Sequence, residues 1–304
     1  MLRSLLASAV GLVLFASPLA GQADGQLLER RRCASLRPYE EVAAIARARR
    51  REPTAEAGYR RMQRGAVCDR LTYASDGLRV VAIMVRPNRT QGKRLPVIIY
   101  NHGSGADGAL EEQVQLDQAQ WVEEGYLFIA PQYRGGGGSE GRDEYGGADV
   151  HDVTNLYPLL RQLPYADTAN IFIWGHSRGG TMTFLAMRAG MPIRAAAVTA
   201  TLADYTGWPR SIVATLPDSA RHVGERQRSA VAWPELIRAP VLMLHGDADR
   251  IVPVAPMRRL AAQLDSLGRP HELVVYPGGD HNLTDHGDDA LGRIRAWFRR
   301  YRQD

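Results

Sequence analysis

The chain has 304 residues, of which 45% are hydrophobic and 23% charged, so it is long enough for one large domain with a sizeable core. Its formal net charge of +5 comes almost entirely from arginine, since Lys93 is the only lysine, and the arginines are interspersed with acids. A nucleic-acid-binding protein concentrates its basic residues in a stripe. The densest group, Arg47 to Arg51, is interpreted as the solvated face of a helix, so no nucleic-acid partner is expected.

The first 23 residues have the layout of a signal peptide. One arginine precedes an apolar run over residues 5–16, and small and turn-forming residues follow. The run is too short for a comfortable membrane span, and cleavage after Ala20 or Ala23 fits the small residues there. We expect an exported protein, periplasmic or extracellular, with no stable membrane anchor after cleavage of residues 1–23. An uncleaved amphipathic anchor is the alternative.

Only two cysteines are present, Cys33 and Cys68. In an exported protein such a pair predicts a disulfide, which the loop-entropy relation values at about 3 to 4 kcal/mol. Two cysteines without a histidine cluster make a poor zinc site, so no metal is expected. Residues 24–68 are predicted to form a helical segment packed on the core, with helical spacing over 36–65 and a stop at Gly65.

From residue 69 to 304 strands and helices alternate, which predicts an α/β fold. The expected strands are 70–74, 78–86, 95–100, 126–131, 170–174, 193–199, 240–245 and 272–276, and the expected helices are 111–124, 149–163, 181–189, 256–267 and 288–302. Continuous apolar strands suit a mostly parallel, doubly wound sheet covered by helices on both faces. Residues 203–235 break this rhythm and form either a small cap or a solvated excursion.

The segment Gly175-His176-Ser177-Arg178-Gly179 carries the G-x-S-x-G pattern of a nucleophile elbow. An apolar strand precedes it and a helical segment follows, which is the context such an elbow needs. The turn would expose the Ser177 hydroxyl at the carboxyl end of a strand. An inert serine in a glycine-rich turn is the alternative.

A serine nucleophile needs a base, and the base needs a carboxylate that orients it. Asp247 and Asp249 follow the strand over 240–245, and His281 follows the glycine turn after the strand over 272–276. These loops are expected at the same sheet edge as Ser177. His281 is preferred over His286, which lies at the approach to the last helix, whereas the residues alone leave both aspartates open.

A tetrahedral intermediate also needs hydrogen-bond donors for its oxyanion. The backbone amide of Arg178, directly after the nucleophile, is one candidate. The second is expected in the glycine-rich loop after strand 95–100, where the Ser104 amide is preferred and Gly103 is the alternative.

The order Ser, Asp, His is that of the α/β-hydrolase superfamily, and two loops resemble one branch of it. His245-Gly246-Asp247-Ala248-Asp249-Arg250-Ile251-Val252-Pro253 is similar to the acid loop of the prolyl oligopeptidase and dienelactone hydrolase groups. The resemblance implies Asp249 as the triad acid and leaves Asp247 to brace the turn. The loop over 131–141 resembles the arginine-glycine loop of prolyl oligopeptidase catalytic domains. There Arg134 is expected to brace the loop through Asp149 or Asp152.

The resemblance covers about residues 75–302 and implies a serine hydrolase that needs no cofactor. Prolyl oligopeptidases carry a large β-propeller, for which the segment ahead of this domain is too short, so we expect carboxylic esters or short acyl or aminoacyl amides as substrates. A prolyl oligopeptidase-type peptidase acting on short peptides is the alternative. A catalytically silent binding protein of the same fold is a third possibility. The sequence specifies neither the acyl group nor the oligomeric state.

Overall fold

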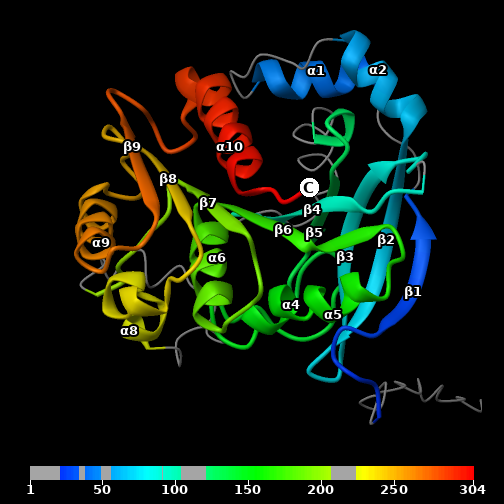
Figure 1. Ribbon diagram of the computed structural model, residues 1–304, viewed down its shortest axis with the longest axis horizontal. Coiled ribbons are helices and arrows are strands. Elements are labelled where there is room, and N and C mark those ends of the chain that lie inside the picture. Colours follow the sequence, from blue (N-terminus) through cyan, green and yellow to red (C-terminus); the bar gives the residue numbers. More distant parts are fainter. Residues whose placement is uncertain (1–20, 34–37, 49–55, 91, 104–120, 207–223) are drawn as a thin grey trace, which may run out of the picture.

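The computed structural model describes residues 21–33, 38–48, 56–90, 92–103, 121–206 and 224–304 (Figure 1). Its centre is a nine-stranded sheet in the order β1-β2-β3-β5-β4-β6-β7-β8-β9. The first three strands and the β3–β5 pair are antiparallel, and all pairs from β5 to β9 are parallel. The predicted α/β-hydrolase fold, with its mostly parallel sheet, is confirmed.

The bounds of the elements follow the expected alternation. The strands are β1 (Leu27–Arg32), β2 (Ala66–Ser75), β3 (Leu78–Pro87), β4 (Leu95–Asn101), β5 (Leu127–Pro131), β6 (Ala166–His176), β7 (Ala195–Thr199), β8 (Val241–Gly246) and β9 (His271–Tyr276). The helices are α1 (Tyr39–Ala48), α2 (Glu56–Gly65), α4 (Val150–Thr154), α5 (Leu156–Arg161), α6 (Arg178–Arg188), α8 (Glu225–Arg228), α9 (Ala255–Ser266) and α10 (Gly287–Tyr301).

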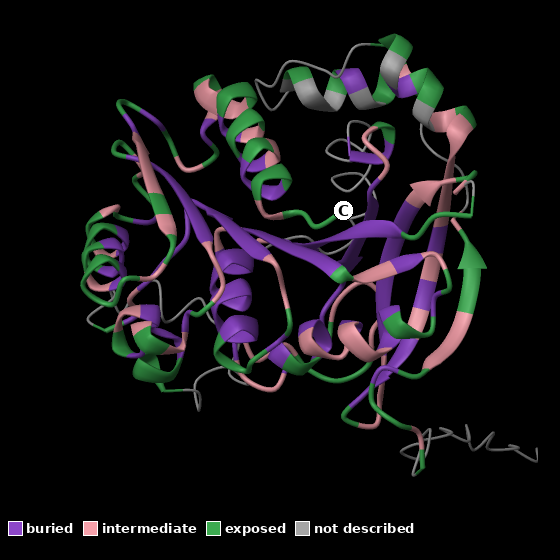
Figure 2. Cartoon of the chain, in the orientation of Figure 1, coloured by how far each residue is buried: buried purple, intermediate pink, exposed green. Residues whose placement is uncertain are grey.

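The parallel strands are buried on both faces, as their continuous apolar sequences require. In β4, Val97 and Ile99 join the core under α4, α5, α6 and α9, whereas Ile98 and Tyr100 join the core under α10. Figure 1 shows α10 on one side of the sheet and α4, α5 and α6 on the other. Figure 2 shows the middle of the sheet and α6 as buried, whereas α10 and α9 carry exposed residues. This two-sided core holds the strand ends rigidly.

Two expectations about local structure were wrong. Residues 24–68 are not helical throughout, because Leu27–Arg32 is an edge strand paired antiparallel with β2. Its sequence lacks alternation, and the main-chain ladder to β2 decides its conformation. The helix expected over 149–163 is broken between Thr154 and Leu156. Pro158 has no N–H for the Thr154 carbonyl and its ring crowds that carbonyl, so a continuous helix cannot form there.

Some sequence predictions lie wholly or partly outside the described residues. They are the signal peptide up to residue 20, most of the helix over 111–124, and residues 207–223 of the region proposed as a cap. The two ends of that region are hydrogen-bonded to each other. The Val231 amide donates to the Ala203 carbonyl at 3.2 Å, and the Tyr205 amide donates to Ser229 Oγ at 2.8 Å.

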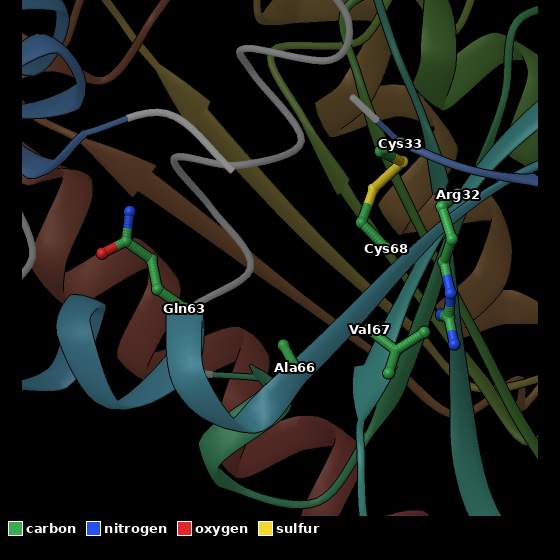
Figure 3. Close-up of a pocket in the computed structure, with 6 residues that line it drawn as sticks. All are labelled: Arg32, Cys33, Gln63, Ala66, Val67 and Cys68. Carbon is green, nitrogen blue, oxygen red and sulfur yellow. A yellow bond between two sulfur atoms is a disulfide. The ribbon is translucent and has the colours of Figure 1, made fainter. Parts of the chain in front are cut away.

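The two cysteines are bonded to each other and join the end of β1 to β2. Figure 3 shows this disulfide beside a pocket of about 320 Å³ that is also lined by Arg32, Gln63 and Ala66. None of the predicted triad residues lines this pocket. In the part of the chain that the structure describes, no helix is long and apolar enough to cross a membrane.

Candidate active site

The nucleophile elbow lies at the junction of β6 and α6. Ser177 has φ 54° and ψ −121°, a left-handed conformation that costs energy for a residue with a side chain. Its backbone N–H donates to the Thr199 carbonyl at 2.8 Å, which anchors the turn to β7. A Cβ at Gly175 would lie 2.2 Å from the Gly179 carbonyl oxygen, and a Cβ at Gly179 would lie 1.8 Å from the Asn101 carbonyl oxygen. The turn therefore requires glycine at both positions.

Ser177, His281 and Asp249 form one hydrogen-bonded chain. His281 Nε2 lies 3.0 Å from Ser177 Oγ, and His281 Nδ1 lies 2.8 Å from Asp249 Oδ2. The three side chains come from the ends of β6, β9 and β8, which the parallel sheet brings to one edge. This is the geometry in which an imidazole can accept the serine proton while a carboxylate orients it.

The Asp249 carboxylate is buried and its acceptor sites are filled. Oδ1 accepts the backbone N–H groups of Ile251 and Val252, both at 2.8 Å, while Oδ2 accepts from His281 and lies 3.4 Å from His245 Nε2. Burial by itself would raise the pKa of Asp249. Hydrogen bonds from His245, His281 and the Val252 backbone outweigh burial and hold this pKa well below its usual range. Asp249 is therefore an anion that orients His281 and does not compete for its proton.

The other candidates have structural partners. Asp247 Oδ1 accepts the Gly278 backbone N–H at 2.7 Å and so braces the loop before His281. His286 stacks on the Tyr276 ring, with a centroid separation of 4.8 Å. Asp280 accepts the backbone N–H groups of Asn282 and Thr284, at 3.1 and 2.8 Å, which shapes the turn that presents His281.

Of the expected oxyanion donors, the Arg178 amide and the alternative second donor, Gly103, are among the described residues. Arg178 is the first residue of α6, so its backbone N–H has no acceptor within the helix. Gly103 passes close to the nucleophile, because a Cβ added there would lie 3.5 Å from Ser177 Cβ. Ser104, the preferred second donor, lies outside the described residues.

The Arg178 side chain makes contacts that the sequence analysis did not anticipate. Its guanidinium is buried and pairs with Asp143 and Asp149. Of the two predicted partners of Arg134, Asp152 is confirmed, at 2.7 Å, whereas Asp149 binds Arg178. Arg134 also pairs with Asp76 at 2.8 Å. The local sequence holds acids at every one of these positions, and only the path of the loop decides which arginine meets which carboxylate.

The sequence model of the prolyl oligopeptidase family matches residues 113–304. The chain belongs to the prolyl oligopeptidase family. Membership of this family, together with its peptidase relatives, makes the chain a serine hydrolase of peptidase type.

The described residues include no group of three or more His, Cys, Asp or Glu side chains that could hold a metal ion.

Two relatives come from Bacillus subtilis. The uncharacterized peptidase YtmA is 26% identical over 240 residues, which cover 75% of this chain and 92% of YtmA. The uncharacterized peptidase YuxL is 24% identical over 263 residues, which cover 77% of this chain and 39% of YuxL. The chain thus spans nearly all of one prolyl oligopeptidase relative and less than half of the other.

Solved structures share the fold. An acylaminoacyl peptidase in complex with Z-Gly-Gly-Phe-chloromethyl ketone superposes with a TM-score of 0.66 at 20% identity, covering 79% of this chain and 43% of the peptidase. A putative dienelactone hydrolase from Klebsiella pneumoniae has a TM-score of 0.61 at 22% identity, covering 78% of this chain and 99% of the hydrolase. Dienelactone hydrolases, one of the two groups to which the sequence motifs pointed, are thus represented among the structural neighbours of this family member.

Proposed function

We propose that this protein is an exported serine hydrolase that cleaves carboxylic esters and short acyl or aminoacyl amides through Ser177, His281 and Asp249. The observation that carries the proposal is the continuous hydrogen-bonded chain from Ser177 Oγ through His281 to Asp249, with distances of 3.0 and 2.8 Å. Ser177 is a partly exposed residue, as the proposed attack on a substrate carbonyl requires.

The proposed reaction has two steps. Ser177 Oγ attacks the carbonyl carbon while its proton passes to His281 Nε2, and the imidazolium then protonates the leaving alcohol or amine. Water hydrolyses the acyl-enzyme with His281 again as the base. The Arg178 backbone N–H, and a second N–H from the loop that begins at Gly103, are proposed to stabilise the oxyanion in both steps.

A small apolar core cluster packs between α6 and the loop that carries Asp249. Leu202, Tyr205 and Val252 are buried together, with Tyr145 packed against them. The cluster is joined to α6, because Thr181 Oγ1 lies 2.8 Å from the Tyr205 hydroxyl. It reaches the acid loop through Val252, whose N–H donates to Asp249.

The test replaces Ser177 by alanine and measures turnover of a panel of p-nitrophenyl esters and aminoacyl p-nitroanilides. Loss of turnover on the order of 10⁶-fold is expected from triad knockouts, together with loss of labelling by a fluorophosphonate probe. The wild-type ratio of kcat/KM on esters and amides then separates an esterase from a peptidase that accepts short substrates. Full activity of Ser177→Ala would contradict the proposal, and an unlabelled wild type would favour a silent binding protein.

The proposal of export rests on the signal-like residues 1–23. Expression of the full chain in a bacterial host followed by N-terminal sequencing of the periplasmic fraction tests it. A mature protein that begins at Gly21 or Asp24 is expected. An intact N-terminus confined to the cytoplasm would rule out this part.

A further inference from the structure

We propose that the Arg178 side chain is a positioning element that holds both oxyanion-donor segments in register. This inference rests on the proposed function, because it concerns the rate of acyl transfer at Ser177. The backbone N–H of Arg178 is one proposed donor, and its guanidinium is linked through the Tyr133 ring to His102, which precedes the alternative second donor, Gly103.

The guanidinium binds the loop after β5 at two carboxylates. Nη1 lies 2.5 Å from Asp143 Oδ2, Nη2 also contacts Asp143 Oδ1, and Nη2 lies 2.8 Å from Asp149 Oδ2. Asp149 in turn accepts the Gly146 backbone N–H at 2.9 Å. The side chains of Arg178 and Asp149 are 5% and 0% exposed, so water cannot take the place of either partner. The nucleophile elbow is thereby joined to the loop over 143–149.

The same guanidinium reaches the second donor segment through Tyr133. Arg178 Cζ lies 4.9 Å from the centroid of the Tyr133 ring. That ring stacks on the His102 imidazole at a centroid separation of 4.3 Å, and the Tyr133 hydroxyl donates to the His102 carbonyl at 3.3 Å. His102 directly precedes Gly103, which passes the nucleophile. Two contacts therefore connect the Arg178 side chain to the backbone on the opposite side of Ser177.

Strain and burial at this point support a positioning role. Tyr133 and the second aromatic residue over the guanidinium, Tyr145, have φ angles of 51° and 54°, in the left-handed region that costs energy for non-glycine residues. A buried ion pair also recovers little net stability, because its desolvation offsets its attraction. Backbone strain and a desolvated ion pair thus occur together beside Ser177. Because neither stabilises the fold, their presence there supports a functional role.

The contacts predict which kinetic parameter depends on the guanidinium. Loss of the guanidinium would remove a support of Tyr133 and, through it, of the His102–Gly103 backbone. The hydrogen bonds of the Ser177–His281–Asp249 chain do not involve the guanidinium. Donors act on charge that develops only in the transition state. Loss of the guanidinium should therefore lower kcat and leave KM nearly unchanged.

The experiment compares Arg178→Lys with Arg134→Lys. Arg134 is a matched control because its side chain is also buried, at 6% exposed, and also pairs with a buried carboxylate, that of Asp152. Among the described residues it makes no contact with the elbow. Active sites are titrated with a fluorophosphonate, so that kcat refers to competent molecules. The affinity of an alkyl boronic acid, whose adduct with Ser177 is tetrahedral, is measured for each variant.

For Arg178→Lys we expect kcat to fall about 10- to 100-fold and boronate affinity to weaken in parallel, with KM within about threefold of wild type. Arg134→Lys should keep kcat within about twofold. Asp143→Asn retains the shape of its side chain and should reproduce the Arg178→Lys pattern if the lysine variant does not fold.

Equal losses in the Arg178 and Arg134 variants, or a loss in KM alone, would show a merely structural role and overturn the inference. Failure of the proposed function is recognised separately. It would appear as activity that survives Ser177→Ala, whereas failure of this inference alone would leave activity dependent on Ser177 and insensitive to Arg178.

Discussion

Asp247 and Asp249 lie two residues apart in one loop, and their carboxylates bind different partners. Asp249 Oδ2 accepts from the His281 imidazole at 2.8 Å, whereas Asp247 Oδ1 accepts the Gly278 backbone N–H at 2.7 Å. The Asp249 side chain is buried, whereas Asp247 is exposed. One side chain therefore orients the His281 imidazole, and the other braces the loop that carries it.

This difference predicts unequal effects of the same substitution. Asp249→Asn should lower kcat on the order of 10⁴-fold, because an amide cannot hold the imidazole in the required tautomer. Asp247→Asn should stay within about fivefold, since its amide oxygen can still accept from Gly278. Steady-state kinetics with a short ester measures both. A larger loss in Asp247→Asn would exchange the two assignments.

The buried His102 predicts how stability depends on pH. Burial, with a contribution from the nearby Arg178 charge, lowers the pKa of His102 to about 3, and its Nε2 has no hydrogen-bond partner among the described residues. An unfolded histidine titrates near 6.5. Below that pH the unfolded chain binds a proton that the folded protein rejects, so the free energy of unfolding falls with decreasing pH.

The contribution of the neutral His102 to the free energy of unfolding is fully present above about pH 6.5 and is lost as the pH falls toward 3. From pH 6.5 to 4.5 the loss of unfolding free energy should be about 2 kcal/mol. Urea unfolding of wild type and His102→Gln at both pH values isolates it, because other titrating groups are common to the two proteins. Identical pH slopes would indicate that the imidazole is hydrated.

The elbow glycine predicts a destabilising substitution with a matched control. A Cβ at Gly179 would lie 1.8 Å from the Asn101 carbonyl oxygen, which is backbone and cannot rotate away. Gly179→Ala should cost about 3 kcal/mol or more of unfolding free energy. Gly292→Ala, on the exposed side of α10 with no atom within 4 Å, should stabilise by about 0.5 to 1 kcal/mol. Chemical denaturation of the two variants measures whether the unfolding free energy falls for Gly179→Ala and rises for Gly292→Ala.

The disulfide predicts a change in stability without a change in mechanism. Cys33 and Cys68 are separated by 35 positions, and closing such a loop is worth about 3 to 4 kcal/mol through the entropy of the unfolded chain. The Cys33→Ser/Cys68→Ser double variant should lose that amount in urea unfolding. Its kcat at 25 °C should stay within about twofold, because the triad lies on β6, β8 and β9. A selective loss of kcat would reveal coupling between β1 and the site.

Much of the fold could be read from the chain because its signals are local. The apolar stretch before Ser177 and the glycines around it predict a strand and a sharp turn within ten residues of sequence. The pairing of β1 could not be read in this way, because LLERRR has no alternating pattern and becomes a strand only against β2. The helix break after Thr154 could have been predicted from the sequence, because Pro158 cannot donate to the Thr154 carbonyl.

The sequence by itself determined the strands β2 to β9 along the chain, the elbow at Ser177 and the loops that carry Asp249 and His281. Hydrophobic periodicity, glycine and short motifs act over neighbouring residues, so they are visible without the fold. Only the tertiary structure decided that Arg178 binds Asp143 and Asp149 while Arg134 binds Asp152 and Asp76. An ion pair depends on which side chains the packed loops bury together, and a buried charge must pair with the carboxylate that the fold brings within reach.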